Sequence, residues 1–203
     1  MANLKEIRTR ITSVASTMQI TSAMKMVSAA KLKRAQDAIT QMRPYAEKLR
    51  EILVNISSTL EGSAEGVYSQ ERETQKVLIV AIASNRGLCG AFNANIFKAT
   101  EKRIKDYAGK EVQVYPIGKR SVDYFTGKHT IYNSNIEIFN DLNYDHVTVM
   151  AQEVMDAFVE GEFDKVEIIY NEFQNAAIQE VITQQFVPVV ADENEEIDVN
   201  ADY

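Results

Sequence analysis

Hydrophobic residues recur at alternating steps of three and four through the first sixty residues of the chain. Fourteen of the seventeen positions in this series are apolar, and the exceptions are Thr21, Lys25 and Ser28. The series runs through Leu4, Ile7, Ile11, Val14, Met18, Thr21, Lys25, Ser28, Leu32, Ala35, Ile39, Met42, Ala46, Leu49, Leu53, Ile56 and Leu60. A heptad stripe of this length predicts a long helix that forms a coiled coil.

The segment 1–60 contains no glycine, and its one proline, Pro44, should bend the helix locally. At 1.5 Å per residue the helix would be roughly 85 Å long. The rest of the sequence offers no second helix of similar length. The stripe therefore needs a partner, which must be another chain or a segment missing from this one, and we expect the isolated chain to associate with itself.

The hydrophobic period changes after a polar linker at residues 61–75. Short apolar or alternating runs predict strands at 76–84, 111–117, 165–173 and 179–187, with a further edge strand near 136–139. Helices are expected at 92–107, 119–125 and 145–160, the last one capped by Asp145 and closed by Gly161. This order predicts a Rossmann-like α/β domain over 76–190, with a mostly parallel sheet and an antiparallel edge hairpin. Residues 191–203 form an acidic tail.

Charge divides the chain into a basic and an acidic part. Residues 1–60 carry ten Lys or Arg and four acids, whereas 61–203 carry twelve basic and twenty-five acidic residues. The basic charge is concentrated in the small-residue segment Thr21–Arg34, which suits a solvated face, docking to an acidic protein surface, or nucleic acid. Nucleic-acid binding is disfavoured, because no aromatic residue precedes Tyr45 and stacking platforms are absent from the basic segment.

The turn Asn85–Gly90 follows the first predicted strand, where a phosphate-binding loop would lie. Its spelling, NRGLCG, matches neither G-x-G-x-x-G nor the P-loop pattern, so a structural strand-to-helix turn is favoured over nucleotide binding. Cys89 is the only cysteine, and the histidines at 129 and 146 are distant in sequence. We therefore predict no catalytic residue, no metal site and no cofactor, and we expect the chain to be no enzyme by itself.

Three stretches of the sequence carry a family resemblance. They read MANLKEIRTRITSVASTMQITSAMKMVSAAKLKRAQ at the start, MRPYAEKLREIL from Met42 to Leu53 and SNRGLCGAFN from Ser84 to Asn93. In wording, order and spacing the chain resembles the gamma subunit of the bacterial F-type, proton-translocating ATP synthase. The likeness extends more loosely through the strands to Gln184–Val190. Family members continue into a long C-terminal helix, and this sequence stops before it.

The resemblance implies a non-catalytic rotor in the central stalk of a rotary motor. Such a subunit transmits torque between the proton-driven membrane ring and the catalytic alpha and beta subunits, and so couples hydrogen ion transport to ATP synthesis or hydrolysis. Its expected partners are alpha, beta, epsilon and the rotor ring. Its expected location is peripheral, on the cytoplasmic face of the bacterial cell membrane.

The resemblance also implies two sets of contact residues. Beta-subunit levers would contact Met24, Lys25, Lys31, Lys33 and Arg34. The epsilon subunit and rotor ring would meet the foot of the shaft, at Met42, Arg43, Tyr45, Arg86, Gly87 and Gly90. Two other functions compete with the rotor. One is a nucleotide-binding α/β enzyme that oligomerises through its coiled coil, and the other is a coiled-coil adaptor outside any rotary machine.

Overall fold

The computed structural model describes residues 3–60 and 66–189, and for 54–60 it describes the backbone alone. The chain divides into two compact units, residues 1–53 and 54–203, and each is described by itself. The first part of the predicted linker, at 61–65, and the predicted acidic tail lie outside the described residues.

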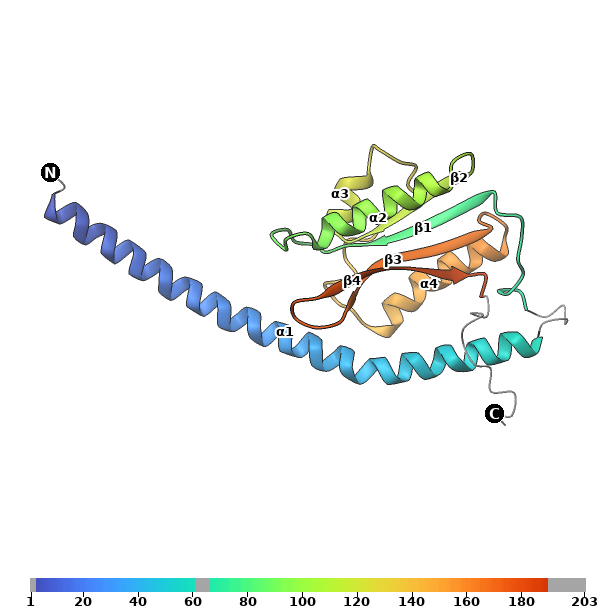
Figure 1. The fold of residues 1–203 in the computed structure, drawn as a ribbon, viewed down its shortest axis with the longest axis horizontal. Coiled ribbons are helices and arrows are strands. Elements are labelled where there is room, and N and C mark those ends of the chain that lie inside the picture. Colours follow the sequence, from blue (N-terminus) through green and yellow to red (C-terminus); the bar gives the residue numbers. More distant parts are fainter. Residues whose placement is uncertain (1–2, 61–65, 190–203) are drawn as a thin grey trace. The chain divides into compact units, whose positions relative to one another are not determined.

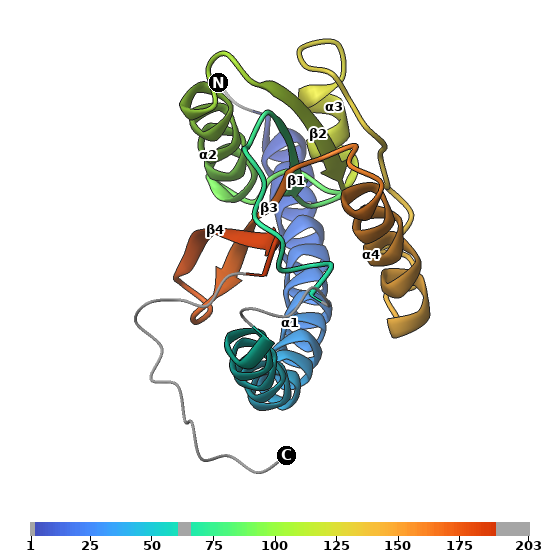
Figure 2. The ribbon, with the colours of Figure 1, turned by 90° about the vertical axis from the view of Figure 1, so that its right-hand side faces the viewer.

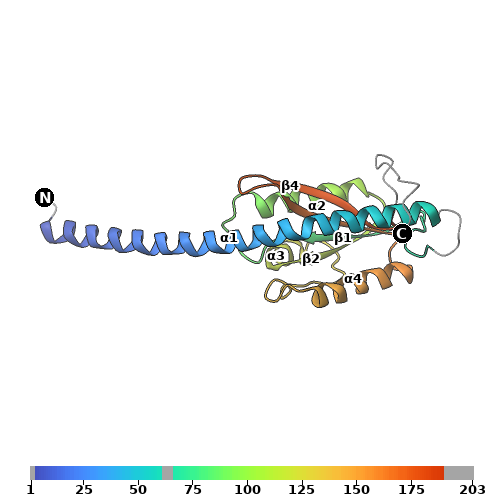
Figure 3. The same ribbon diagram turned by 90° about the horizontal axis from the view of Figure 1, so that it is seen from below.

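The long N-terminal helix is confirmed as α1, Leu4–Leu60, with Pro44 inside it. Asn3 begins the helix, because its side-chain oxygen accepts from the Lys5 N–H at 3.2 Å and its carbonyl accepts from Glu6 and Ile7. Figure 1 shows α1 changing direction in the light-blue part of its ribbon, and Figure 3 shows the helix continuing without a break. Proline removes one ladder hydrogen bond, which accounts for a bend rather than an end.

The second unit is an α/β domain built on a four-stranded sheet in the order β2-β1-β3-β4. β1 pairs in parallel with both β2 and β3, and β3 pairs antiparallel with β4, so the predicted fold class is confirmed. The strands are β1 (Lys76–Ile82), β2 (Glu111–Ile117), β3 (Lys165–Phe173) and β4 (Gln179–Val187); the helices are α2 (Phe92–Asp106), α3 (Lys119–Phe125) and α4 (Tyr144–Val159).

Alternate residues of the strands supply two hydrophobic clusters, one on each face of the sheet. In β1, Val77 and Ile79 pack on the side of α2 and α3, whereas Leu78 and Val80 pack on the side of α4. Figure 2 shows α2 and α4 on opposite sides of the strands. All four of these β1 side chains are at most 5% exposed, which explains why β1 reads as one continuous apolar run rather than as an alternating one.

Two local predictions for this domain were wrong. Residues 136–139 form a bend and turn, and the segment beside β2 is 130–135, with isolated parallel bridges from Val114 to Ile131 and from Ile117 to Asn135. The cap of α4 is Asn143 rather than Asp145, because the Asn143 side chain accepts from the His146 N–H at 2.9 Å. Asp145 instead lies in the first turn, where its charge favours the helix dipole.

Candidate functional site

The apolar stripe of α1 is exposed to solvent over most of its described length. Ile11, Val14 and Met18 are each 64–68% exposed, and Met42 and Leu53 are more than half exposed. A shallow groove follows the stripe and is lined by Ser13, Val14, Thr17, Met18, Thr21, Ser22 and Lys25. A row of large apolar side chains in water is unfavourable by about 1.5 to 3 kcal/mol for each residue that could be buried, so this surface suits a helical partner.

The predicted lever-contact residues are all exposed on α1, but they do not form one face. At 100° per residue, Met24 and Lys31 lie on nearly the same side of the helix, with Arg34 next to them. Lys25 is turned about 100° away, within the stripe, and Lys33 lies on the side opposite Met24. Residues 7–36 contain no acid, so positive charge surrounds the helix here.

In the second unit, the turn after β1 is held by two asparagines. Asn93 is buried, and its side-chain oxygen accepts from the N–H and the hydroxyl of Ser84, each at 3.0 Å. Asn85 donates to the Ile136 carbonyl at 2.9 Å and accepts from the Lys119 N–H at 2.8 Å. The turn is therefore fixed to the start of α2, to α3 and to the 130–140 segment, as a structural strand-to-helix turn would be.

The tip of this turn points outward. Leu88 is fully exposed and has a positive φ of 60°, which is unusual for a branched side chain. Gly90 shares that backbone conformation. Gly87 is closely covered, since an added Cβ would lie 2.9 Å from the Arg120 guanidinium. Arg86 is exposed at the start of the tip.

The other predicted foot residues lie on α1, in the first unit. Met42 and Tyr45 are 62% and 65% exposed, and Arg43 is half-buried. The structure thus gathers Arg86, Gly87 and Gly90 in one turn and places the α1 residues in a separate unit.

The described residues contain no cluster of His, Cys, Asp and Glu that could hold a metal ion. Cys89 is exposed and lies 3.2 Å from the side-chain nitrogen of Asn93. The histidines have partners elsewhere: His129 meets Glu101 at 3.0 Å, and His146 meets the Asp141 carbonyl at 2.9 Å. No histidine therefore serves Cys89 as a base in the described part of the chain.

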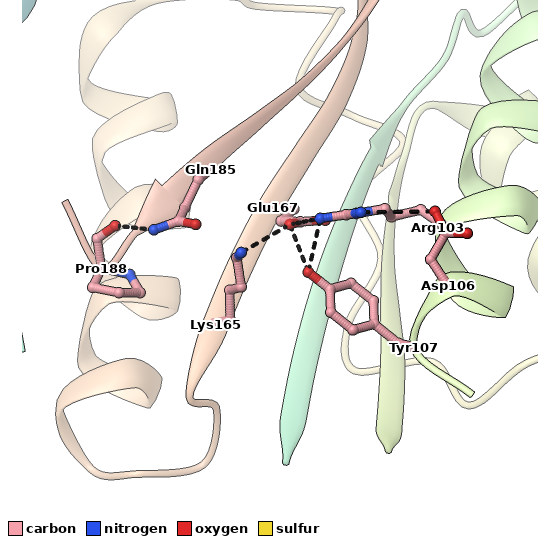
Figure 4. A network of polar contacts seen from close by, with 7 residues as sticks. All are labelled: Arg103, Asp106, Tyr107, Lys165, Glu167, Gln185 and Pro188. Carbon is pink, nitrogen blue, oxygen red and sulfur yellow. Dashed lines mark hydrogen bonds and ion pairs between the residues drawn. The ribbon is translucent and has the colours of Figure 1, made fainter. Parts of the chain in front are cut away.

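Among the described residues of the domain, the most buried charge is Glu167 on β3, whose side chain is 3% exposed. Arg103 on α2 donates to it twice, from Nε to Oε2 and from Nη2 to Oε1, each at 2.6 Å. The Tyr107 hydroxyl donates to Oε1 at 2.7 Å, and Lys165 Nζ lies 3.4 Å away. Figure 4 shows these side chains converging on the carboxylate between α2 and the sheet.

The network shifts the pKa of each of its three main members. Burial alone would raise the pKa of Glu167, but hydrogen bonds from Arg103 and Tyr107 and the nearby positive charges lower it. The hydrogen bond to Glu167 raises the pKa of Arg103 further above its ordinary value. Burial, followed by the bond to Glu167, raises the pKa of Tyr107 well above 10. The ionised carboxylate is therefore the stable form, and its chemistry is that of a clamp between α2 and β3 rather than of a general base.

Sequence reasoning missed this network. A lone acid inside the apolar strand Val166–Tyr170 was the available signal, because an acid at an inward position requires a buried partner. The partner itself lies 64 residues earlier in the chain, and no local pattern connects the two.

These features define a class of protein: a long helix with an exposed coiled-coil stripe, joined in one chain to a small Rossmann-like α/β domain. Within the described residues, no helix has the length and apolar character needed to cross a membrane.

Comparisons with known proteins narrow this class. A family model described as ATP synthase matches residues 3–203. The ATP synthase gamma chain of Flavobacterium johnsoniae is 59% identical over 189 residues, covering 93% of this chain and 66% of the relative. The ATP synthase gamma chain of Christiangramia forsetii is 50% identical over 202 residues, covering 98% of this chain and 71% of the relative. The chain belongs to the ATP synthase gamma chain family.

A solved structure supports the same fold. The central stalk and c-ring structure of the Tetrahymena thermophila mitochondrial ATP synthase contains a chain that aligns with a TM-score of 0.63 at 23% identity, over 83% of this chain and 72% of that one. At this identity the likeness concerns the fold alone. The chain spans about two thirds of the length of the curated relatives it matches, 66% and 71% in the two cases above.

Proposed function

We propose that this chain is the central-stalk rotor of an F-type ATP synthase. It is not catalytic by itself; it transmits torque between a proton-driven membrane ring and the ring of alpha and beta subunits, and so couples proton transport to ATP synthesis or hydrolysis. It is peripheral to the membrane and reaches the cytoplasmic face of the bacterial membrane through the complex. The observation that carries the proposal is the exposed stripe of α1 in a member of the gamma chain family.

The proposed beta-subunit contacts are Met24, Lys25, Lys31, Lys33 and Arg34. Because these exposed residues surround α1 rather than forming one face, positive charge is presented in several directions at once. A shaft inside a ring meets partners on every side, and cationic side chains opposite acidic levers would make the contact energy depend on the rotation angle. Lys25 within the stripe and Lys33 on the opposite side would then face different neighbours.

The proposed contacts of the foot are Met42, Arg43 and Tyr45 on α1 and Arg86, Gly87 and Gly90 in the turn. The proposed partners are the epsilon subunit and the rotor ring. Support for the turn comes from its frame of asparagine hydrogen bonds, which holds an exposed tip in a fixed conformation. Crosslinking from Cys89 in the assembled complex tests this assignment. A crosslinked product with the beta subunit alone would contradict the proposed contact of the turn with epsilon and the rotor ring.

The rotor function is tested by deleting residues 1–40 and reconstituting the complex. We expect proton-coupled ATP synthesis to be lost, because most of the exposed stripe and all of the proposed lever contacts are removed. A control variant that removes one positive charge outside the proposed contacts, Lys98→Gln at an exposed position on α2, should keep coupling. Full coupling by the deleted complex would refute the proposal.

The nucleotide-binding enzyme is not favoured, because the family matches are to ATP synthase gamma chains. Titration calorimetry with ATP or NAD against the isolated chain separates the two functions. Tight binding that is lost in a Gly87→Val variant would support the nucleotide-binding enzyme, and an absence of binding heat agrees with the rotor function.

A further inference from the structure

The first turns of α4 are exposed on all sides. Every residue from Asp141 to Val149 is exposed, and burial in this helix begins only at Met150. Four large apolar residues lie in this stretch: Leu142 at 65% exposure, Tyr144 at 82%, Val147 at 44% and Val149 at 70%. These four residues are called the α4 tip below.

Local structure, rather than packing, holds the α4 tip in shape. The Asn143 side chain accepts from the His146 N–H at 2.9 Å, and His146 Nδ1 lies 2.9 Å from the Asp141 carbonyl. Leu142 and Val147 occupy the two positions of a hydrophobic staple, before the cap and at the fourth residue of the helix. Tyr144 and Val149 are 82% and 70% exposed, so little of either side chain is buried in the fold.

The charge around the α4 tip has one sign. From His129 to Asp164 the chain has eight acids and no Lys or Arg. Six of these acids are exposed along α4 and in the segments that flank it: Glu137, Asp141, Asp145, Asp156, Glu160 and Glu162. Asp141 and Asp145 lie within the exposed stretch itself, and an apolar surface with carboxylates and no Lys or Arg beside it along the chain is complementary to an apolar segment bordered by Lys and Arg.

We infer that the α4 tip docks a basic, amphipathic segment of another subunit of the complex. Tyr144 and Leu142 supply the apolar anchor, and Asp141 and Asp145 supply the attraction that sets orientation. This contact adds to the proposed rotor function and differs from the predicted lever and foot contacts, none of which lies on α4. It can therefore fail while torque transmission stands.

The test places a photocrosslinking amino acid at Leu142 in the assembled ATP synthase and identifies the crosslinked peptides by mass spectrometry. The matched control places the same group at Lys102, an exposed position on α2. We expect a product with one apolar segment rich in Lys or Arg, at a yield at least about fivefold above the control. The Val149→Ser and Asp141→Lys variants should each lower that yield severalfold, because they remove an apolar contact and reverse a charge.

These substitutions lie at exposed positions, so the near-ultraviolet circular dichroism of the domain should not change, and this measurement separates lost docking from lost folding. A yield no higher than at Lys102 would overturn the inference. So would a product with an acidic segment, or with a second copy of this chain. ATP synthesis measured on the same samples reports the rotor function independently.

Discussion

Replacing Arg103 with Met should destabilise the α/β domain, because it leaves the Glu167 carboxylate buried without its main partner. Two hydrogen bonds of 2.6 Å are lost, and a side chain that is 3% exposed has little access to water. Removing one member of a buried ion pair costs about 3 to 5 kcal/mol. Tyr107 and Lys165 remain near the carboxylate, so we expect a loss at the lower end, about 3 kcal/mol.

The opposite substitution should cost less. Glu167→Gln leaves Arg103, whose side chain is 33% exposed and can regain water, so about 1 to 2 kcal/mol is expected. Arg103→Lys keeps the charge but loses the paired donors, and its effect should be intermediate. In the double variant Arg103→Met, Glu167→Met no buried charge remains. That variant should be more stable than Arg103→Met alone.

Urea unfolding measures these differences, with the near-ultraviolet circular dichroism of the tyrosines as the probe because the chain has no tryptophan. In the wild type, the lowered pKa of Glu167 contributes stability that is fully present above the unfolded value of 4.5 and is lost as the pH falls through the folded pKa. In Arg103→Met, the main compensation for burial is lost, so the pKa of Glu167 should rise. Protonation of Glu167 then removes the cost of the buried charge in the variant. The difference in unfolding free energy between the wild type and Arg103→Met should therefore narrow from neutral pH to about pH 4.

Two results would refute this reasoning about the clamp. One is a larger loss in Glu167→Gln than in Arg103→Met, which would mean that the guanidinium and not the carboxylate is the costly buried charge. The other is a difference in unfolding free energy between the wild type and Arg103→Met that stays constant with pH. In that case the network would contribute packing alone.

Three further predictions use other parts of the chain. Gly118→Ala should lower the free energy of urea unfolding by about 3 kcal/mol or more, because φ is 88° and the new Cβ would lie 2.1 Å from the Ala83 carbonyl oxygen. Gly90→Ala has a φ of 60° and open space, so it should lower that free energy by about 1 kcal/mol, and equal losses would contradict the steric explanation. Burial, followed by the charge of Glu153, raises the pKa of Tyr115 to about 12. Glu153→Gln should therefore lower this pKa in a titration followed by nuclear magnetic resonance, and an unchanged pKa would mean that burial is its only cause. The isolated chain should self-associate in sedimentation equilibrium, and a strict monomer with a folded α1 would contradict this. The double variant Ile11→Asp, Met18→Asp should shift the chain toward monomer, whereas Gln19→Asp, which lies off the stripe, should not.

The sequence predicts best where the signal is local. The heptad series of α1 and the apolar run of β1 each repeat over neighbouring residues, and both elements were located correctly. Residues 136–139 also alternate as Ile-Glu-Ile-Phe, but strand formation depends on which segment lies at the free edge of β2, and that segment is 130–135. Asn143 and Asp145 are both good caps, and only the backbone conformation of Asn143 decides between them.

The predicted sites show the same limit. Composition identifies the basic segment of α1, but helix phase separates Lys25 and Lys33 from Met24. Glu167 and Arg103 meet only because α2 crosses the sheet, a non-local event that no spacing encodes. The glycines of the turn at Arg86–Gly90 do not have the spacing of a phosphate-binding loop, and the absence of nucleotide binding there stays a prediction.

The two units differ in what stabilises them, and this bears on how a rotor would work. The α/β domain has a hydrophobic cluster on each face of its sheet and a buried ion pair between α2 and β3. The first half of α1 relies on weaker local contacts: threonine hydroxyls at positions 9, 12, 17 and 21 bond to carbonyls four residues earlier, and Arg10 pairs with Glu6 at the surface. Surface pairs contribute little, and helix stability in proteins comes mostly from packing. The order of this half should therefore depend on partners that cover the stripe, whereas the domain should fold without them.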